Sequence, residues 1–131
     1  MNLKTERSAI EKLIFSFGDS FNSSDISGVV SAFMPDGVLM PNNGPLVKGH
    51  EPIEALYESL FKVFKINITY TIDEIVINGD YAFARTNSGV ETLIRASGES
   101  VSLINKELFV IKKDNAQWKI ADYIFNNTSK N

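Results

Sequence analysis

INITYTID, residues 66–73, is the stretch of sequence that decides the fold. Isoleucine or tyrosine stands at every second position, and polar residues stand between them. Side chains of a β-strand point alternately to its two faces, so a period of two predicts a half-buried strand. The spacing of apolar residues before this stretch is mainly helical, and we therefore expect a helical half followed by a strand half.

Three more strands are predicted after this stretch. Asn78 and Gly79 form a hairpin signal, and strands are expected at about 81–93, 101–112 and 117–125. Each strand would pair antiparallel with the next, and strands of this length span roughly 35–40 Å. A sheet that long over so few helices must curl, and a curled sheet with helices across its mouth encloses space.

Three helices are predicted before the strands, because apolar residues recur three, four or seven positions apart over 3–21, 26–33 and 53–64. The turn-forming residues 35–37 should end the second helix, and 38–40 should form a short strand. The sequence thus predicts an α+β fold in which three N-terminal helices pack in the concave face of a strongly curved antiparallel sheet.

Length and charge restrict the class of protein. The 131 residues suit one domain over 1–131. A net charge of -3 argues against nucleic acid and against an anionic membrane surface, because both attract basic proteins. Residues 1–7 are polar, and the chain has no apolar run of the roughly 18 residues that a membrane span needs. We therefore expect a cytoplasmic protein.

The chain has no cysteine and one histidine. Disulfides, thiolate chemistry and a zinc site are therefore not expected, and no metal or cofactor is predicted. His50 stands where a helix should begin, and we interpret it as a solvated residue of the first turn rather than as a catalyst.

Several short motifs, taken in their order along the chain, resemble the SnoaL-like family. They are Phe21-Asn22-Ser23-Ser24-Asp25, Pro35-Asp36-Gly37-Val38, Gly49-His50-Glu51-Pro52, Glu107-Leu108-Phe109-Val110 and Trp118-Lys119-Ile120-Ala121. This ketosteroid-isomerase-like family lies in the nuclear transport factor 2-like superfamily, which includes isomerases, cyclases, dehydratases and members without known chemistry. The resemblance implies a conical pocket between the first helix, the third helix and the concave face of the sheet. It also implies a homodimer through the outer face of the sheet.

The steroid isomerases of this superfamily use a carboxylate base after the short strand and a tyrosine on the first helix. One group removes a proton, and the other donates to the developing oxyanion. Counting from Asp36, the position of the base falls at Pro41, and counting back from Asp25, the position of the tyrosine falls at Phe17. Neither side chain can perform its role, so this mechanism is not expected.

Asp122 and Glu107 are the candidate acid–base residues, because a carboxylate in an apolar cavity has a raised pKa. Trp118 and Ile120 should face the core, and alternation would then turn Asp122 inward. Polyketide-cyclase relatives are thought to use one such carboxylate, which favours Asp122. The alternative is that Glu107 is held by an internal ion pair with Arg85 or by hydrogen bonds. A shift of one residue in register would reverse each assignment.

The candidate ligand-binding residues combine aromatic positions on the helices with polar positions on the strands. They are Phe17, Met40, Tyr57, Phe61, Arg85, Asn105 and Asn126. At helical spacing the aromatic residues also suit an ordinary core. By the same alternation Tyr123 and Phe125 should point away from the pocket, toward the partner in a dimer.

Three functions are open at this point. The first is binding of a small, largely apolar ligand, with cyclase, isomerase or dehydratase chemistry on an unknown substrate as one form of it. The alternative is a non-catalytic homodimeric module whose pocket is filled by its own side chains, which the abundance of phenylalanine favours. The third is a scaffold that docks another protein on the surface of the sheet.

Overall fold

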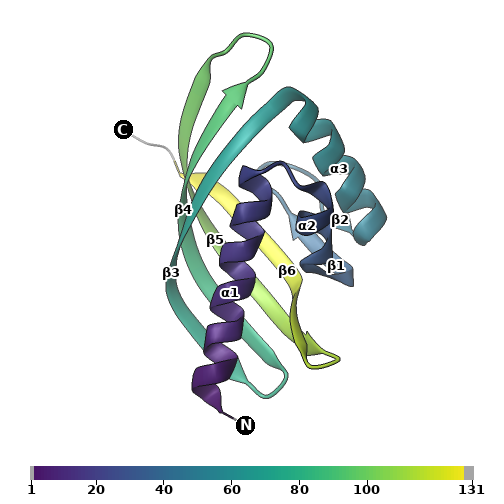
Figure 1. Ribbon diagram of the computed structural model, residues 1–131, viewed down its shortest axis with the longest axis vertical. Coiled ribbons are helices and arrows are strands. Elements are labelled where there is room, and N and C mark those ends of the chain that lie inside the picture. The colour runs from purple at the N-terminus through teal and green to yellow at the C-terminus, as the bar shows by residue number, and fades with distance from the viewer. Residues whose placement is uncertain (1, 129–131) are drawn as a thin grey trace.

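The computed structural model describes residues 2–128, which form three helices and one six-stranded sheet (Figure 1). α1 lies across the concave face of the twisted sheet, and α3 lies beside α2 and β1. The predicted α+β fold is confirmed. Across residues 2–128, no helix combines the length and the apolar character that crossing a membrane requires. In chain order the elements are α1 (Leu3–Asn22), α2 (Ile26–Ser31), β1 (Phe33–Met40), β2 (Val47–Lys48), α3 (His50–Val63), β3 (Phe64–Asn78), β4 (Tyr81–Ile94), β5 (Ser100–Asp114) and β6 (Gln117–Thr128).

α1 turns its apolar stripe toward the sheet. The helix begins after Asn2, whose side-chain oxygen accepts a hydrogen bond from the backbone N–H of Lys4 at 2.9 Å. One face then buries Ile10, Ile14 and Phe17, with contacts to β3 and β6. The helical spacing seen in the sequence therefore places α1 inside the curve of the sheet, where it can shape an enclosed site.

The strands are ordered β2-β1-β6-β5-β4-β3 across the sheet. β3, β4, β5 and β6 form the antiparallel meander that the sequence predicts. β1 pairs parallel with β6, so the sheet is mixed rather than wholly antiparallel. This pairing joins segments from opposite ends of the chain, and no local pattern indicates it.

β1 also begins earlier than the sequence predicts. Phe33 belongs to this strand rather than to the second helix, and the expected turn at 35–37 lies within the strand. The pairing of β1 with β6 is irregular between Phe33 and Val38, so the turn-forming residues interrupt the strand instead of preceding it. The two-residue strand β2 was not predicted, and it pairs antiparallel with the end of β1.

Two β-bulges change the phase of the alternation in the long strands. The extra residue is Asp73 in β3 and Ala121 in β6, and in the described ladders neither has an antiparallel partner. A bulge places two residues of one strand opposite one residue of its neighbour and bends the strand. As a result Ile120 and Tyr123, three positions apart, both lie on the concave face.

The end of α1 covers part of the free edge of β3. Asn22 accepts from the backbone N–H of Ile68 at 2.6 Å and donates to the carbonyl of Ile68 at 3.0 Å. The side-chain amide thus takes the place of a neighbouring strand at this residue. Pairing of this kind protects an exposed edge from other chains and fixes the helix against the sheet.

The first turn of α1 is tied to the β5–β6 hairpin by Glu6. Its carboxylate accepts hydrogen bonds from Lys113 Nζ and from Trp118 Nε1, each at 2.7 Å. The bond from Lys113, followed by that from Trp118, holds the pKa of Glu6 below its ordinary value. The carboxylate of Glu6 therefore fixes the start of α1 to the β5–β6 hairpin.

Replacing Glu6 with glutamine should lower the stability at neutral pH, because an amide cannot form the ion pair with Lys113. Since the folded-state pKa of Glu6 is lowered, its contribution is complete above the pKa of the unfolded chain and is lost as the pH falls through the folded-state pKa. The difference in melting temperature between wild type and Glu6→Gln should therefore shrink below about pH 4.

Thermal unfolding followed by circular dichroism across this pH range measures the difference. The control is Glu11→Gln, which removes an exposed pair with Arg7 on the same helix and should change little. An effect of Glu6→Gln that stays constant with pH would contradict the role assigned to its charge.

Candidate functional site

A cavity of about 460 Å³ opens between α3, the loop after β1 and the concave face of the sheet. Leu56, Tyr57 and Leu60 of α3 form one wall. The opposite wall comes from β3, β4, β5 and β6, because their inward-pointing residues lie next to one another across the ladder. Among the described residues that line the cavity, none carries a formal charge.

The rim of the cavity is formed by the loop between β1 and β2. Pro41, Asn42 and Pro45 line the cavity from this loop. The Asn42 side-chain oxygen accepts a hydrogen bond from the backbone N–H of Asn127 at 3.1 Å, which ties the loop to β6. Pro41 and Pro45 each fix one φ angle, which restricts the backbone of the rim further.

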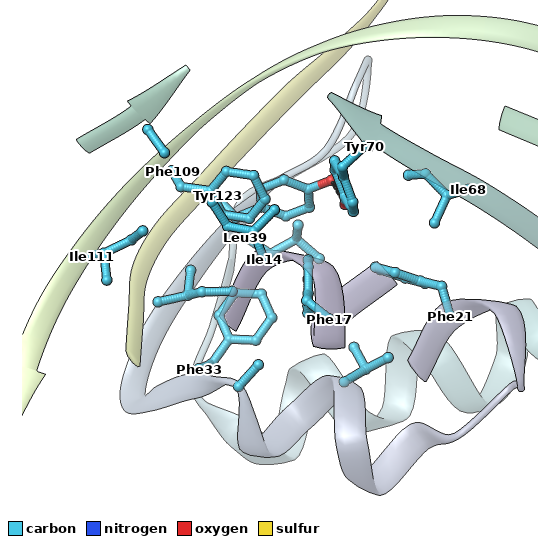
Figure 2. Close-up of a cluster of buried hydrophobic side chains, with 14 of the residues drawn as sticks. Ile14, Phe17, Phe21, Phe33, Leu39, Ile68, Tyr70, Phe109, Ile111 and Tyr123 are labelled. Carbon is cyan, nitrogen blue, oxygen red and sulfur yellow. Dashed lines mark hydrogen bonds between the residues drawn. The ribbon is translucent and has the colours of Figure 1, made fainter. Parts of the chain in front are cut away.

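Aromatic rings fill the part of the cone next to the cavity (Figure 2). Phe17 of α1 makes edge contacts with Tyr123 and with Phe33, at centroid distances of 5.2 and 5.6 Å. Phe109 stacks on Tyr123 at 4.6 Å. Phe21 and Tyr123 then separate this cluster from the open space and form the floor of the cavity. The side chains of the chain itself therefore fill one part of the cone and leave another part open.

Three buried tyrosines lie at or beside the cavity: Tyr57 in its α3 wall, Tyr123 in its floor and Tyr70 in contact with Tyr123. The hydroxyls of Tyr70 and Tyr123 are 2.6 Å apart, and either one can donate to the other. Burial raises the pKa of Tyr57, Tyr70 and Tyr123, so all three remain neutral hydrogen-bond donors. Gly18 allows this arrangement, because a Cβ there would lie 3.1 Å from the ring of Tyr70.

Glu107 is a buried carboxyl on the concave face of β5, where it is 3% exposed. It accepts hydrogen bonds from the hydroxyl of Thr86, at 2.7 Å, and from that of Ser88, both on β4. Burial raises the pKa of Glu107, and the two hydroxyls oppose the rise because they stabilise the ionised form. A carboxyl in this state can accept or release a proton closer to neutral pH than an exposed one.

Asn105 lies two residues before Glu107 on the same face of β5, and it lines the cavity. Its side chain is 6% exposed. Glu107 itself does not line the cavity, so Asn105 stands between the open space and the buried carboxyl along the strand. The wall of the cavity thus combines aliphatic and aromatic groups with a few neutral polar ones.

The match to a known family covers most of the chain. A model of the SnoaL-like domain matches residues 16–121, which include α2, α3 and all of β1 to β5. The chain belongs to the SnoaL-like domain family. No curated protein matches it significantly.

Solved structures with this fold are similar to this chain over almost its whole length. A ketosteroid isomerase-like protein from Erwinia carotovora atroseptica SCRI1043 has a TM-score of 0.87 at 28% identity, with 94% of this chain and 96% of that chain covered. A protein provisionally assigned as a scytalone dehydratase, from Novosphingobium aromaticivorans DSM 12444, has a TM-score of 0.85 at 16% identity, with 95% and 85% covered.

A third structure is a provisionally assigned dehydratase of the NTF2-like family from Streptomyces avermitilis. Its TM-score is 0.82 at 12% identity, with 97% of this chain and 99% of that chain covered. At such identities the last two structures show the fold alone, because one fold carries many activities. What the SnoaL-like domain does must therefore be argued from its own cavity.

The prediction that Asp122 and Asn126 face the pocket is wrong. The bulge at Ala121 shifts the phase of β6, so both residues lie on the outer face of the sheet. Tyr123 and Phe125, which were expected to point outward, line the cavity instead. Asp122 therefore does not lie where the predicted acid–base role requires it. The alternation of polar and apolar residues in the sequence does not reveal the bulge.

Arg85 is also outside the cavity. It lies on the outer face of the sheet, where its guanidinium is 2.8 Å from the carboxylate of Glu74. The ion pair expected between Arg85 and Glu107 does not form, and Thr86 and Ser88 supply the hydrogen bonds to Glu107 instead. Glu107 is thus held by internal hydrogen bonds, as the alternative prediction stated. Its catalytic role stays a prediction.

The remaining candidates divide between the cavity and the core. Tyr57 and Asn105 line the cavity. Phe17 and Phe61 pack in the aromatic cluster, where Phe61 lies against Tyr57 at a centroid distance of 5.7 Å. Met40 faces away from the cavity, which its neighbour Leu39 lines. The loop residues of the rim were missed because no periodicity marks a loop as part of a site.

The positions that correspond to the steroid isomerase machinery carry no reactive group. Phe17 is enclosed by aromatic rings, and Pro41 stands at the rim of the cavity. Within residues 2–128, no three histidine, aspartate or glutamate side chains gather as a metal site would require. Glu107 supplies a carboxyl group beside the cavity, and the polar residues that line the cavity are neutral: Asn42, Tyr57, Thr92, Asn105, Tyr123 and Asn127.

Replacing Thr86 with valine should raise the pKa of Glu107 further, because it removes one hydrogen bond to the ionised carboxylate and keeps the shape of the side chain. The carboxyl carbon of Glu107, observed by ¹³C NMR during a pH titration, reports this pKa. The control is Thr71→Val, since Thr71 is exposed on the outer face of β3. A pKa of Glu107 that is unchanged or lower in Thr86→Val would contradict the assigned hydrogen bond.

Proposed function

We propose that this protein binds a small, largely apolar molecule in the cavity between α3 and the sheet. The observation that carries the proposal is the cavity itself, whose volume of about 460 Å³ lies within the range of roughly 300–1,000 Å³ typical of ligand sites. Its walls are mainly aliphatic and aromatic, so a ligand would be held mostly by burial of its apolar surface.

The alternative function, in which the pocket is filled by the side chains of the protein itself, accounts for only one part of the interior. The cluster around Phe17 occupies the space next to α1, but the space beside α3 stays open above Tyr123. Protein interiors are close-packed, and voids larger than a few water molecules are rare in them. An open cavity of this size with a rim tied in place therefore favours ligand binding over a purely structural module.

Acid–base chemistry of the isomerase or dehydratase kind is a second candidate, and Glu107 is the residue that would support it. Its carboxyl is buried, its pKa is raised, and it lies on the face that bears the cavity. Asn105 lies nearer the open space, so a ligand would have to reach past this residue for direct proton transfer. Binding is thus the better supported function.

A second copy of the chain is the proposed partner, through the outer face of the sheet. Ile104, Leu108 and Ile124 lie on this face and are about 40% exposed. Leu108 and Ile124 stand directly opposite each other on β5 and β6, so their side chains form an apolar pair on this face. Apolar patches on a sheet face are commonly buried between subunits.

Filling the cavity should prevent binding. Leu60→Trp places an indole ring in the open space, and we expect it to weaken binding of the neutral fluorescent probe N-phenyl-1-naphthylamine by about tenfold or more. Fluorescence titration of the probe measures the dissociation constant. Val63→Trp is the control, because Val63 lies on the same helix but is exposed and outside the cavity. Equal binding by both variants, or none by the wild type, would argue against the proposed site.

Introducing a charge on the outer face should separate the proposed dimer. Ile124→Lys places an ammonium group in the apolar surface, and sedimentation velocity should show a monomer where the wild type forms a dimer. The control is Leu46→Lys, a change at an exposed loop residue that should leave the dimer intact. A wild-type protein that stays monomeric as its concentration rises would exclude this partner.

A further inference from the structure

Asn105 has an unusual place in the wall of the cavity. Its side-chain oxygen is buried and, in the described part of the chain, has no hydrogen-bond partner. The one other buried side-chain oxygen in this condition, on Ser24, lies just after α1 and does not line the cavity. Leaving a buried hydrogen-bond acceptor unpaired costs free energy, so native proteins rarely tolerate it without a reason.

The neighbours of Asn105 cannot supply the missing partner. Ser88 stands directly opposite on β4, but its hydroxyl donates to Glu107. Thr86 donates to the same carboxyl, so the hydroxyls of Ser88 and Thr86 are both used by Glu107. Asn127, opposite on β6, also lines the cavity, and among the described residues its side chain does not donate to the oxygen of Asn105. Because Asn105 lines the cavity, a molecule that occupies the cavity is the remaining candidate partner for this oxygen.

The charge of the occupant is also restricted. In the described residues, the lining of the cavity offers no charged side chain to pair with an ion. Burying an unpaired charge costs far more than burying a neutral polar group. Glu107, two residues from Asn105 on the same face, would in addition repel an anion whenever it is ionised. A neutral molecule therefore meets a smaller desolvation penalty here than an ion does.

We infer that Asn105 is the polar anchor of this cavity, and that its ligand is an uncharged, mainly apolar molecule with one hydroxyl or amide N–H group that donates to the side-chain oxygen of Asn105. This inference rests on the proposed binding function and adds to it the chemical class of the ligand. Apolar walls supply affinity, whereas the single anchored group sets the orientation in which the molecule lies. Asn105 is accordingly a specificity-determining residue.

A matched series of naphthalenes tests the inference, because its members share one apolar body and differ in one group. The probes are naphthalene, 2-naphthol, 2-naphthoate and 2-naphthylmethylammonium, and calorimetry or displacement of N-phenyl-1-naphthylamine gives their affinities at neutral pH. We expect the wild type to bind 2-naphthol about five- to tenfold more tightly than naphthalene, as one net hydrogen bond allows. Both ions should bind at least tenfold more weakly than 2-naphthol.

Asn105→Leu should reverse the preference between the two neutral probes. Without a partner the hydroxyl loses its hydration and gains nothing in return, so naphthalene should bind more tightly than 2-naphthol. The variant should also melt at an equal or higher temperature, since it removes an unpaired buried amide, and this shows that it folds. Asn87→Leu, on the outer face of β4, is the control and should keep the preference of the wild type.

The outcomes separate this inference from the binding function. If the wild type binds both neutral probes equally, or if Asn105→Leu keeps the preference for 2-naphthol, Asn105 is not the anchor although the cavity binds ligands. If either ion binds as tightly as 2-naphthol, the ligand class is wrong. If no member of the series binds the wild type, the binding function fails and the inference fails with it.

Discussion

The packing of Phe17 against the concave side of the sheet is the contact on which the rest of the structure depends. Its ring meets aromatic rings from α1, β1, β3, β5 and β6, with centroid distances between 4.8 and 6.3 Å. Large rings in edge and stacked contacts bury much area and resist compression. The cluster therefore holds α1 inside the curve of the sheet and keeps the sheet apart from α3, and the cavity is the space that results.

The sequence was sufficient for those parts of the fold that depend on local periodicity. The alternation in residues 66–73 and the spacing on α1 and α3 arise from which side chains are buried, so they predict the elements directly. The parallel pairing of β1 with β6 has no such signal, because it depends on residues that are distant in sequence. Pro35 and Gly37 misled the prediction for β1, since turn-forming residues can also interrupt a strand.

The candidate site shows the same division. β5 has no bulge among its inward residues from Leu103 to Phe109, so counting in twos places Asn105 and Glu107 on the concave face. β6 has a bulge at Ala121, so the same counting assigns the residues after Ala121 to the wrong face of the sheet. Asp122 and Tyr123 were consequently assigned to each other's side. The raised pKa of Glu107 and the unpaired amide of Asn105 require the positions of neighbouring strands, which a single sequence does not contain.

The two bulges lie on β3, an edge strand, and on β6, inside the sheet, and neither bulge residue lines the cavity. Each bulge adds one residue that has no cross-strand partner. The residues before and after it would face the same sides of the sheet if that residue were removed. Gain or loss of such a residue would alter the bend of its strand and leave the lining unchanged. In this architecture the curvature of the sheet can evolve through single-residue insertions and deletions, independently of the chemistry of the cavity walls.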